Sequence, residues 1–188
     1  MPKLTIEQLD LRGKRVFIRA DLNAPLVQGQ VSDDTRLRAV LPTIQLALKA
    51  GAAVVLASHL GRPKGKPSPE SSLRSVALCL EGLLGQPVEL APDCVGAETE
   101  ARAKALRPGE VLLLENLRFH PEEEANDDGF ARQLAALADC YVDDAFAAAH
   151  RAHASIVAIT KHLQPAAAGV LMQQELAALG RILGAPAR

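Results

Sequence analysis

Several arginine and histidine residues of this chain follow directly after apolar runs, a placement that suits the binding of an anion. Residues 58–65, SHLGRPKG, come after the apolar run at 52–57 and include His59 and Arg62. A guanidinium group can donate two hydrogen bonds to one carboxylate or phosphate, and glycine lets the backbone approach a ligand closely. Further cations of this kind are Arg36, Arg118, His150 and Arg151. Gathered at one sheet edge, they predict a site for a compact anion with several charges.

The same residues do not fit other common sites. Residues 61–67 have the wrong glycine spacing for a nucleotide phosphate-binding loop, and Pro67 stands where that loop needs serine or threonine. No strand is followed by the Gly-x-Gly-x-x-Gly pattern of dinucleotide-binding proteins. A hydrolase triad of Ser58, His59 and Asp21 lacks the Gly-x-Ser-x-Gly turn around its nucleophile. Nucleotide binding and hydrolysis are therefore not indicated.

The histidines raise the question of a metal site. His150 and His153 have a spacing that could place two imidazoles on one helical face. Arg151 lies between them and would repel a divalent ion, so we expect no metal. Taken singly, His120 and His153 are more often surface or hydrogen-bonded core residues than ligand-binding groups.

Two further polar segments follow the first apolar run. In residues 19–25, RADLNAP, the side chains of Asp21 and Asn23 would share a face if the backbone were extended. There they could contact a hydroxyl or carboxylate, although a turn in which aspartate caps the backbone is at least as compatible with the sequence. Arg36, in residues 33–36 (DDTR), could equally pair with a nearby acid such as Asp33.

Composition limits the classes of protein and partner. The chain has 188 residues, 48% of them hydrophobic, which is enough for one large packed domain. A net charge of -1 argues against nucleic acid as a partner, because polyanion binding needs a surplus of cations. Its three cysteines lack a Cys-x-x-Cys pair, and no apolar run is long enough for a signal peptide or a membrane span. We expect a cytoplasmic protein without membrane contact.

The hydrophobic pattern alternates between strands and helices. It predicts strands at 16–20, 54–57, 88–90, 111–114 and 140–142, and a short one at 166–168. It predicts helices at 42–50, with Pro42 in the opening turn, at 72–84, at 98–106 and after Asn126 or Asp127. Such alternation favours a doubly wound α/β fold, a parallel sheet of about six strands with helices on both faces. Ligands of such sheets bind beyond the carboxyl ends of the strands.

The chain resembles the phosphoglycerate kinase family in five segments. They are RADLNAP (19–25), DTR (34–36), SHLGRPKG (58–65), LENLRF (114–119) and the stretch from DAF (144–146) through His150 and Arg151. The likeness covers nearly the whole chain in the family's order. It implies a Rossmann-like domain at residues 1–168 that binds 3-phosphoglycerate, followed at 169–188 by the start of an interdomain helix. The C-terminal domain, which in the family binds Mg-ATP or Mg-ADP, is then expected to be absent from this chain.

The resemblance also assigns roles. It places the glycerate end of the substrate at Asp21 and Asn23 and the charged groups at Arg36, His59, Arg62, Arg118 and Arg151, with Leu60 and Gly61 in the binding loop. Arg36 is implied as the catalytic residue, and His150 and His153 belong to a surrounding basic patch. Three positions depart from the family pattern: Asp143 replaces a usual asparagine, Ala147 a usual glycine and Leu22 a common aromatic residue.

The implied function is reversible phosphoryl transfer between a nucleotide and a carboxyl group in glycolysis, with no cofactor held by this chain. The chain alone is expected to bind 3-phosphoglycerate or 1,3-bisphosphoglycerate without turnover. The full enzyme is expected to be a monomer, whereas the apolar positions of the last helix, such as Leu176 and Leu179, could make this chain self-associate. The alternative is a non-catalytic module, either an anion sensor or an assembly domain.

Overall fold

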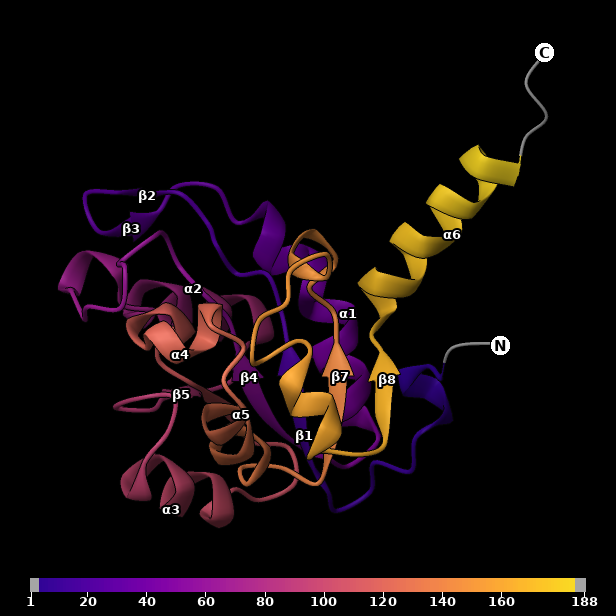
Figure 1. Ribbon diagram of the computed structural model, residues 1–188, viewed down its shortest axis with the longest axis horizontal. Helices are drawn as coiled ribbons and strands as arrows, with labels where there is room; N and C mark the ends of the chain where they lie inside the picture. Colours follow the sequence, from indigo (N-terminus) through magenta and orange to yellow (C-terminus); the bar gives the residue numbers. More distant parts are fainter. Residues whose placement is uncertain (1–3, 185–188) are drawn as a thin grey trace.

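The computed structural model describes residues 4–184 and shows a parallel sheet between helices (Figure 1). Within this range the main sheet has the strands β1 (Arg15–Arg19), β4 (Ala53–Ala57), β5 (Val88–Leu90), β6 (Val111–Leu113), β7 (Cys140–Asp143) and β8 (Ala166–Ala168). Their order is β5-β6-β4-β1-β7-β8, and every pair is parallel. A small antiparallel hairpin, β2 (Leu26–Val27) and β3 (Gln30–Val31), lies apart from this sheet.

The helices connect these strands as crossovers. They are α1 (Thr35–Lys49), α2 (Arg74–Leu84), α3 (Ala97–Ala105), α4 (Pro121–Glu124), α5 (Asp128–Ala135) and α6 (Val170–Gly184). Short 3-10 helices are η1 (Ile6–Gln8), η2 (Pro69–Ser71), η3 (Leu117–Phe119), η4 (Phe146–Ala148) and η5 (Ala158–Lys161). The predicted doubly wound α/β class and the strand at 166–168 are confirmed.

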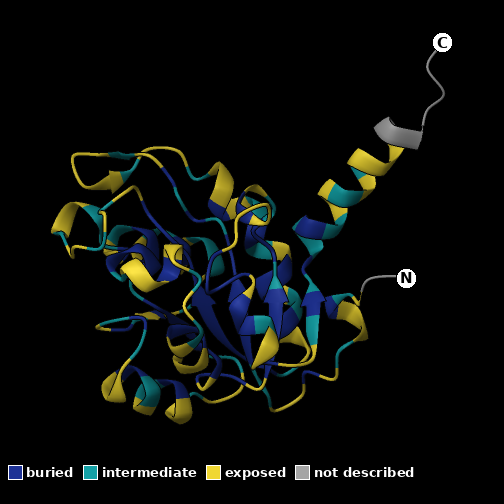
Figure 2. Cartoon of the chain, in the orientation of Figure 1, coloured by how far each residue is buried: buried dark blue, intermediate teal, exposed yellow. Residues whose placement is uncertain are grey.

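Alternating side chains of the central strands β1, β4, β6 and β7 contribute to two separate cores. On one face, Val54 and Leu56 of β4 pack with residues of α1 and α2 such as Ile44 and Leu80. On the other, Val55 packs with residues of α3 and α5. Both faces are therefore buried, which explains why the strands read as continuous apolar runs. Figure 2 shows the buried residues concentrated along the sheet and the exposed ones on the outer surfaces of the helices.

The helix predicted at 42–50 is seven residues longer at its N-terminal end, and the prediction that Pro42 lies in its opening turn is wrong. The helix α1 begins at Thr35, and Pro42 lies on its exposed side. Leu37, Val40 and Ile44 recur at helical spacing and are buried. Their burial outweighs the loss of the one backbone hydrogen bond that a proline cannot donate.

Other predicted boundaries shift by small amounts. The helix α2 begins at Arg74 rather than Ser72, and it ends as predicted at Gly85, whose φ is 68°. Asp127, one of the two candidate caps, accepts a hydrogen bond from the Phe130 N–H and starts α5. The sequence pattern did not predict α4 or the hairpin of β2 and β3, because each is too short to show a period.

At its C-terminal end the described chain extends away from the sheet. The helix α6 projects from the edge at β8, with its first turn packed against α1 and its later residues largely exposed (Figures 1 and 2). Residues 185–188 of the predicted interdomain segment lie outside the described residues. Within residues 4–184, no helix is both long enough and apolar enough to cross a bilayer.

Candidate anion-binding site

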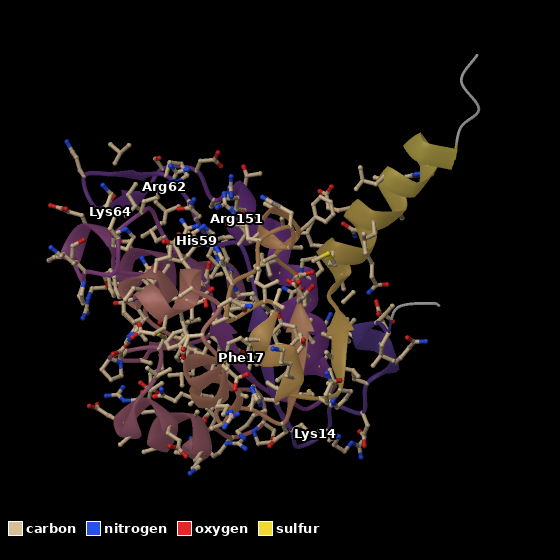
Figure 3. All side chains as sticks on the ribbon, viewed as in Figure 1. Lys14, Phe17, His59, Arg62, Lys64 and Arg151 are labelled. Atoms are coloured by element: carbon tan, nitrogen blue, oxygen red, sulfur yellow. The ribbon has the colours of Figure 1, made fainter. Side chains whose placement is uncertain are left out.

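A cavity of about 290 Å³ opens beyond the carboxyl ends of four neighbouring strands, β6, β4, β1 and β7. It is lined by Asp21, Asn23, Arg36, His59, Gly61, Arg62, Arg118, Ala147, Ala148 and Arg151. In Figure 3, His59, Arg62 and Arg151 lie at this end of the sheet and Lys14 lies at the opposite end. The structure therefore brings together cations that are more than a hundred residues apart in the chain.

The parallel register explains this convergence. Arg19, the last residue of β1, is paired with Ala57 at the end of β4 and with Asp143 at the end of β7. The segments that follow these strands consequently leave the sheet at the same level. After β1 the chain adds β4 on one side of β1 and later adds β7 on the other side, so the strand order reverses at β1. Ligands of doubly wound folds bind at such a reversal, beyond the carboxyl ends of the strands.

Asp21 and Asn23 form a turn rather than a shared extended face. The Asn23 N–H donates to Asp21 Oδ1 at 3.2 Å, which is the aspartate-capped turn that the sequence left open. Asn23 Oδ1 in turn accepts a hydrogen bond from the Gly61 N–H at 2.8 Å. This contact joins the loop after β1 to the loop after β4 and fixes the floor of the cavity between them.

Arg36 lies in the first turn of α1 and pairs with Asp21, not with Asp33. Asp33 instead accepts hydrogen bonds from the backbone N–H and hydroxyl of Thr35, at 2.9 and 2.5 Å, at the beginning of α1. The Arg36 side chain is half exposed, so the N–H donors that do not contact Asp21 can still reach a ligand. Its position at the cavity rim leaves it available to an incoming anion.

Arg118 is much more buried than the other cations of the cavity. Its Nη1 donates to the Gly61 carbonyl at 2.8 Å, and its Nε lies 3.3 Å from Glu124 Oε1. Burial lowers the pKa of Arg118, Glu124 raises it, and the neighbouring cations Arg151, Arg19 and Arg62 lower it again. Since an arginine starts far above neutral pH, the group stays charged.

The side chain of Asn116 holds the segment after β4 and the segment after β6 at a fixed separation. Its amide nitrogen donates to the carbonyls of Leu60 and Ser71, at 2.7 and 2.8 Å. Its Oδ1 accepts from the N–H groups of Leu60 and Arg118, at 3.2 and 3.0 Å. The side chain is fully buried and uses its whole hydrogen-bonding capacity, so it aligns the backbone on both sides of the cavity.

His59 lies beside the buried cations and is neutral. Burial, followed by the charges of Arg19 and Arg118, lowers the pKa of His59 to about 2. An uncharged imidazole still offers one N–H donor and one acceptor nitrogen. His59 therefore contributes directed hydrogen bonding to the cavity, while its arginines contribute the positive charge.

Three of the predicted site residues do not line the cavity. The Leu60 side chain is buried in the core that includes α2, although its backbone is part of the loop after β4. His150 is exposed on a turn, and His153 is buried with its Nδ1 3.8 Å from Glu123 Oε1. Neither histidine lies on a helix, so the prediction that they could share one helical face is wrong.

Two residues near the cavity, Ala148 and Arg19, were not singled out from the sequence, and Ala147 was noted there only as a departure from the family pattern. Ala147 and Ala148 of η4 line it, and their small side chains leave room beside Arg151. Arg19 lies behind it, 1% exposed, within hydrogen-bonding distance of His59. A lone cation inside the otherwise apolar run 16–20 was the signal that could have identified Arg19, since arginine is almost never fully buried without partners.

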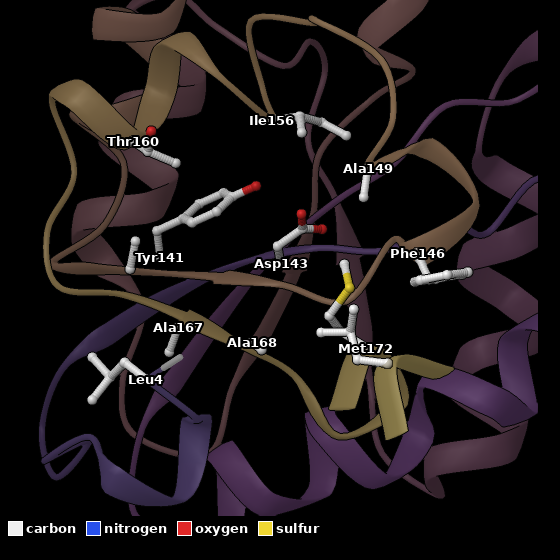
Figure 4. A pocket seen from close by; sticks show the side chains of 12 residues that line it. Leu4, Tyr141, Asp143, Phe146, Ala149, Ile156, Thr160, Ala167, Ala168 and Met172 are labelled. Carbon is white, nitrogen blue, oxygen red and sulfur yellow. The ribbon is translucent and has the colours of Figure 1, made fainter. Parts of the chain in front are cut away.

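A second, larger cavity of about 460 Å³ lies between β7, β8 and the first turns of α6 (Figure 4). Its walls are mostly apolar and include Phe146, Ile156, Met172 and Leu176. Asp143 faces this cavity, and burial raises its pKa. Asp143 does not line the smaller cavity with Arg36, Arg62, Arg118 and Arg151, which we call the arginine cavity, but the charge of the buried Arg19 does act on its carboxylate.

A group of Asp93, Cys94 and His120 brings three metal-ligating atoms within 4.8 Å of one another. These atoms are already engaged or protected: His120 Nε2 lies 2.7 Å from Asp93 Oδ1, and the Cys94 N–H donates to the same oxygen at 2.6 Å. Burial raises the pKa of the Cys94 thiol well above its usual value, which disfavours the thiolate that metals bind. We therefore interpret the group as a hydrogen-bonded pair of His120 and Asp93 beside the buried thiol of Cys94.

Together, the fold and the site define a doubly wound α/β domain with an arginine-lined cavity at the carboxyl edge of its sheet. A family model described as "Phosphoglycerate kinase" matches residues 6–188, and the chain belongs to that family, as the sequence motifs predicted. The phosphoglycerate kinase of Moorella thermoacetica is 61% identical over 188 residues, and that of Desulforudis audaxviator is 58% identical over 189 residues.

Solved structures agree with this assignment. A structure of phosphoglycerate kinase from Coxiella burnetii, 41% identical, superposes on the whole chain with a TM-score of 0.88, and the chain covers 46% of it. The enzyme from Pyrococcus horikoshii, 36% identical, superposes on 98% of the chain with a TM-score of 0.89. The chain spans about half the length of the curated relatives it matches, 48% of each of the two named above.

Proposed function

We propose that this chain binds 3-phosphoglycerate in the arginine cavity and thereby presents the acceptor carboxylate for phosphoryl transfer. The single observation that supports this most directly is the meeting of Arg36, Arg62, Arg118 and Arg151 around one small cavity. A three-carbon acid with a phosphate at one end needs cations at both of its ends, and guanidinium groups match carboxylate and phosphate oxygens geometrically.

The roles follow from placement. Asp21 and Asn23, held in one turn, contact the hydroxyl and glycerate end of the substrate. Arg62, Arg118 and Arg151 bind its charged oxygens, and the neutral His59 donates a further hydrogen bond. The half-exposed guanidinium group of Arg36 lies at the cavity and stabilises charge on the phosphoryl group during transfer.

In the reaction, a carboxylate oxygen of 3-phosphoglycerate attacks the terminal phosphorus of ATP. A new P–O bond forms, the bond to the ADP oxygen breaks, and ADP leaves without any net change in protons. Because the nucleophile is already ionised, catalysis needs alignment and charge stabilisation rather than a base, and arginine supplies both.

Mg-ATP does not fit the residues of the arginine cavity. Its one carboxylate, Asp21, is paired with Arg36, and the other charged groups are cations, whereas Mg²⁺ requires oxygen ligands. We propose that residues 1–168 form the acceptor domain, that residues 169–188 begin the connection, and that the nucleotide is bound by the part of the family's length that this chain does not cover.

Calorimetric titration of the chain with 3-phosphoglycerate tests the proposal. We expect binding that weakens about ten- to a hundredfold in Arg62→Ala, since a charge-assisted hydrogen bond contributes roughly 1.5–3 kcal/mol. Arg62 is exposed, so its loss should leave the melting temperature unchanged. The matched control is Arg132→Ala, which removes an exposed arginine of α5 that does not line the cavity.

Two analogues separate the contributions of the two ends of the ligand. Glycerol 3-phosphate lacks the carboxylate, and glycerate lacks the phosphate, so each should bind more weakly than the parent acid. No binding of 3-phosphoglycerate by folded chain at low salt would refute the proposal. Equal affinity for unrelated phosphates would instead support a general anion sensor.

A further inference from the structure

Arg19 is a buried cation that ends β1 directly behind the arginine cavity. Its side chain is 1% exposed and makes three hydrogen bonds. Nε donates to Ser155 Oγ at 2.9 Å, Nη1 donates to the Ala20 carbonyl, and Nη2 lies 3.2 Å from His59 Nδ1. A charge held this far from water must serve the structure or the site, because its desolvation is costly.

Glu123 of α4 supplies an opposite charge, which is linked to Arg19 through the side chain of Ser155. Ser155 donates its hydroxyl hydrogen to Glu123 Oε1 at 2.5 Å and its N–H to Oε2 at 2.9 Å. Glu123 is as deeply buried as Arg19. The serine hydroxyl therefore accepts from the cation and donates to the anion, which fixes the orientation of the guanidinium group relative to His59.

The guanidinium group determines which nitrogen of His59 carries the proton. Arginine has only donors and is not deprotonated in proteins. His59 Nδ1 must therefore be the acceptor in the contact with Arg19, and the single proton of a neutral imidazole must reside on Nε2. Among the described residues no hydrogen bond is formed by His59 Nε2, which leaves it free toward the cavity that His59 lines.

We propose that Arg19 is a positioning residue that holds His59 as a neutral Nε2–H donor directed at the bound anion. This inference rests on the proposed function in so far as it names the ligand. Fixing the tautomer avoids the alternative in which a lone pair on Nε2 would face an anionic oxygen and repel it.

The other charged and titratable groups around His59 act in the same direction. Arg118 from the segment after β6, His153 from the segment after η4 and Arg36 from α1 face the imidazole besides Arg19 itself. Together with burial they lower the pKa of His59 to about 2, so the ring remains uncharged across the physiological range. The Nε2–H donor is therefore expected to persist across the physiological pH range.

Nuclear magnetic resonance of the ligand-free chain tests this directly. Two-bond ¹H–¹⁵N correlation spectra distinguish a protonated ring nitrogen from an unprotonated one, and the loss of signals in His59→Gln assigns this residue among the five histidines. We expect His59 to show the Nε2–H tautomer with no titration between about pH 5 and pH 8. A proton on Nδ1, or a doubly protonated ring at about pH 6, would overturn the inference.

Arg19→Met removes the donor and the charge. We expect a mixture of tautomers, a higher pKa of His59 because a neighbouring cation is gone, and 3-phosphoglycerate binding about tenfold weaker. The matched control is Arg15→Met on the same strand: Arg15 pairs with Asp139 at the opposite end of β1, so the His59 signals should not change. An unchanged tautomer in folded Arg19→Met would also overturn the inference.

The outcomes remain separable from the proposed function. The wild-type spectrum is recorded without ligand, so it decides the tautomer even if Arg19→Met does not fold or 3-phosphoglycerate does not bind. A chain that binds 3-phosphoglycerate while His59 carries its proton on Nδ1 would refute the role of Arg19 and leave the substrate assignment intact.

Discussion

At the scale of single residues, the pair of His120 and Asp93 links the stability of the fold to pH. The hydrogen bond that His120 donates to the Asp93 carboxylate raises the pKa of His120 against the opposing effect of burial. Burial raises the pKa of Asp93, but hydrogen bonds from His120 and the Cys94 N–H lower it overall. The stabilisation from His120 is therefore complete below its unfolded pKa of about 6.5 and is lost as pH rises through its higher folded pKa.

This predicts that Asp93→Asn reduces the free energy of unfolding more at about pH 6 than at about pH 8.5. The effect should stay below about 1 kcal/mol because Asp93 is nearly half exposed. Urea unfolding at several pH values measures it. The difference between wild type and variant isolates the pair, since the lowered pKa of His59 makes the whole protein less stable as pH falls. His150→Gln is the control, and identical curves for wild type and Asp93→Asn would contradict the prediction.

Individual site residues were predictable from the sequence where a cation follows an apolar strand, as with Arg62 and Arg118. Their partners were not. The pairing of Arg36 with Asp21 rather than Asp33 depends on where α1 begins relative to β1, which sequence spacing does not determine. The buried role of Arg19 depends on Ser155, 136 residues further along the chain.

At the scale of elements, the junction between β8 and α6 leaves no room for a Cβ atom at Gly169. A Cβ atom at Gly169 would lie 2.3 Å from Asp144 Oδ1, and Asp144 is fully buried. The same oxygen accepts the Met172 N–H at 3.0 Å, at the start of α6. The carboxylate can therefore not move aside without releasing the helix.

We predict that Gly169→Ala lowers the free energy of unfolding by about 1–3 kcal/mol through overpacking. Gly82→Ala is the matched control, because Gly82 lies inside α2 with open space around it. There alanine should stabilise the fold by about 0.5–1 kcal/mol. Chemical denaturation of both variants measures these changes, and a Gly169→Ala protein as stable as Gly82→Ala would show that the junction can rearrange.

The elements themselves were largely predictable because the central strands β1, β4, β6 and β7 are buried along most of their length and helices such as α1, α2 and α5 have an apolar stripe. The α1 boundary was not, since the rule that proline begins a helix was outweighed by the buried positions before Pro42. The hairpin of β2 and β3 has only two residues in each strand, so no alternation could develop.

At the scale of the whole molecule, a net charge of -1 coexists with four arginines around one cavity. Long-range attraction of a phosphorylated acid must therefore come from this local cluster rather than from the protein as a whole. Salt screens such a field: the Debye length falls from about 30 Å at 0.01 M to about 8 Å at 0.15 M ionic strength.

The affinity for the proposed ligand, 3-phosphoglycerate, should accordingly fall about tenfold over this range of salt. Titration calorimetry at several salt concentrations measures it, and the urea unfolding midpoint serves as the control because the fold itself depends on apolar burial. A salt-independent affinity would mean that the arginines are compensated by acids in the folded chain.

The side chain of Asn116 has a consequence for how the cavity meets its ligand. It ties the segment at Leu60 to the segment at Arg118 through the protein interior, before any anion is present. Free and occupied forms should then share nearly the same backbone in both loops. Ligand binding would then cost little conformational entropy in these two loops. The cavity would be preorganised, with a shape that does not depend on the bound ligand.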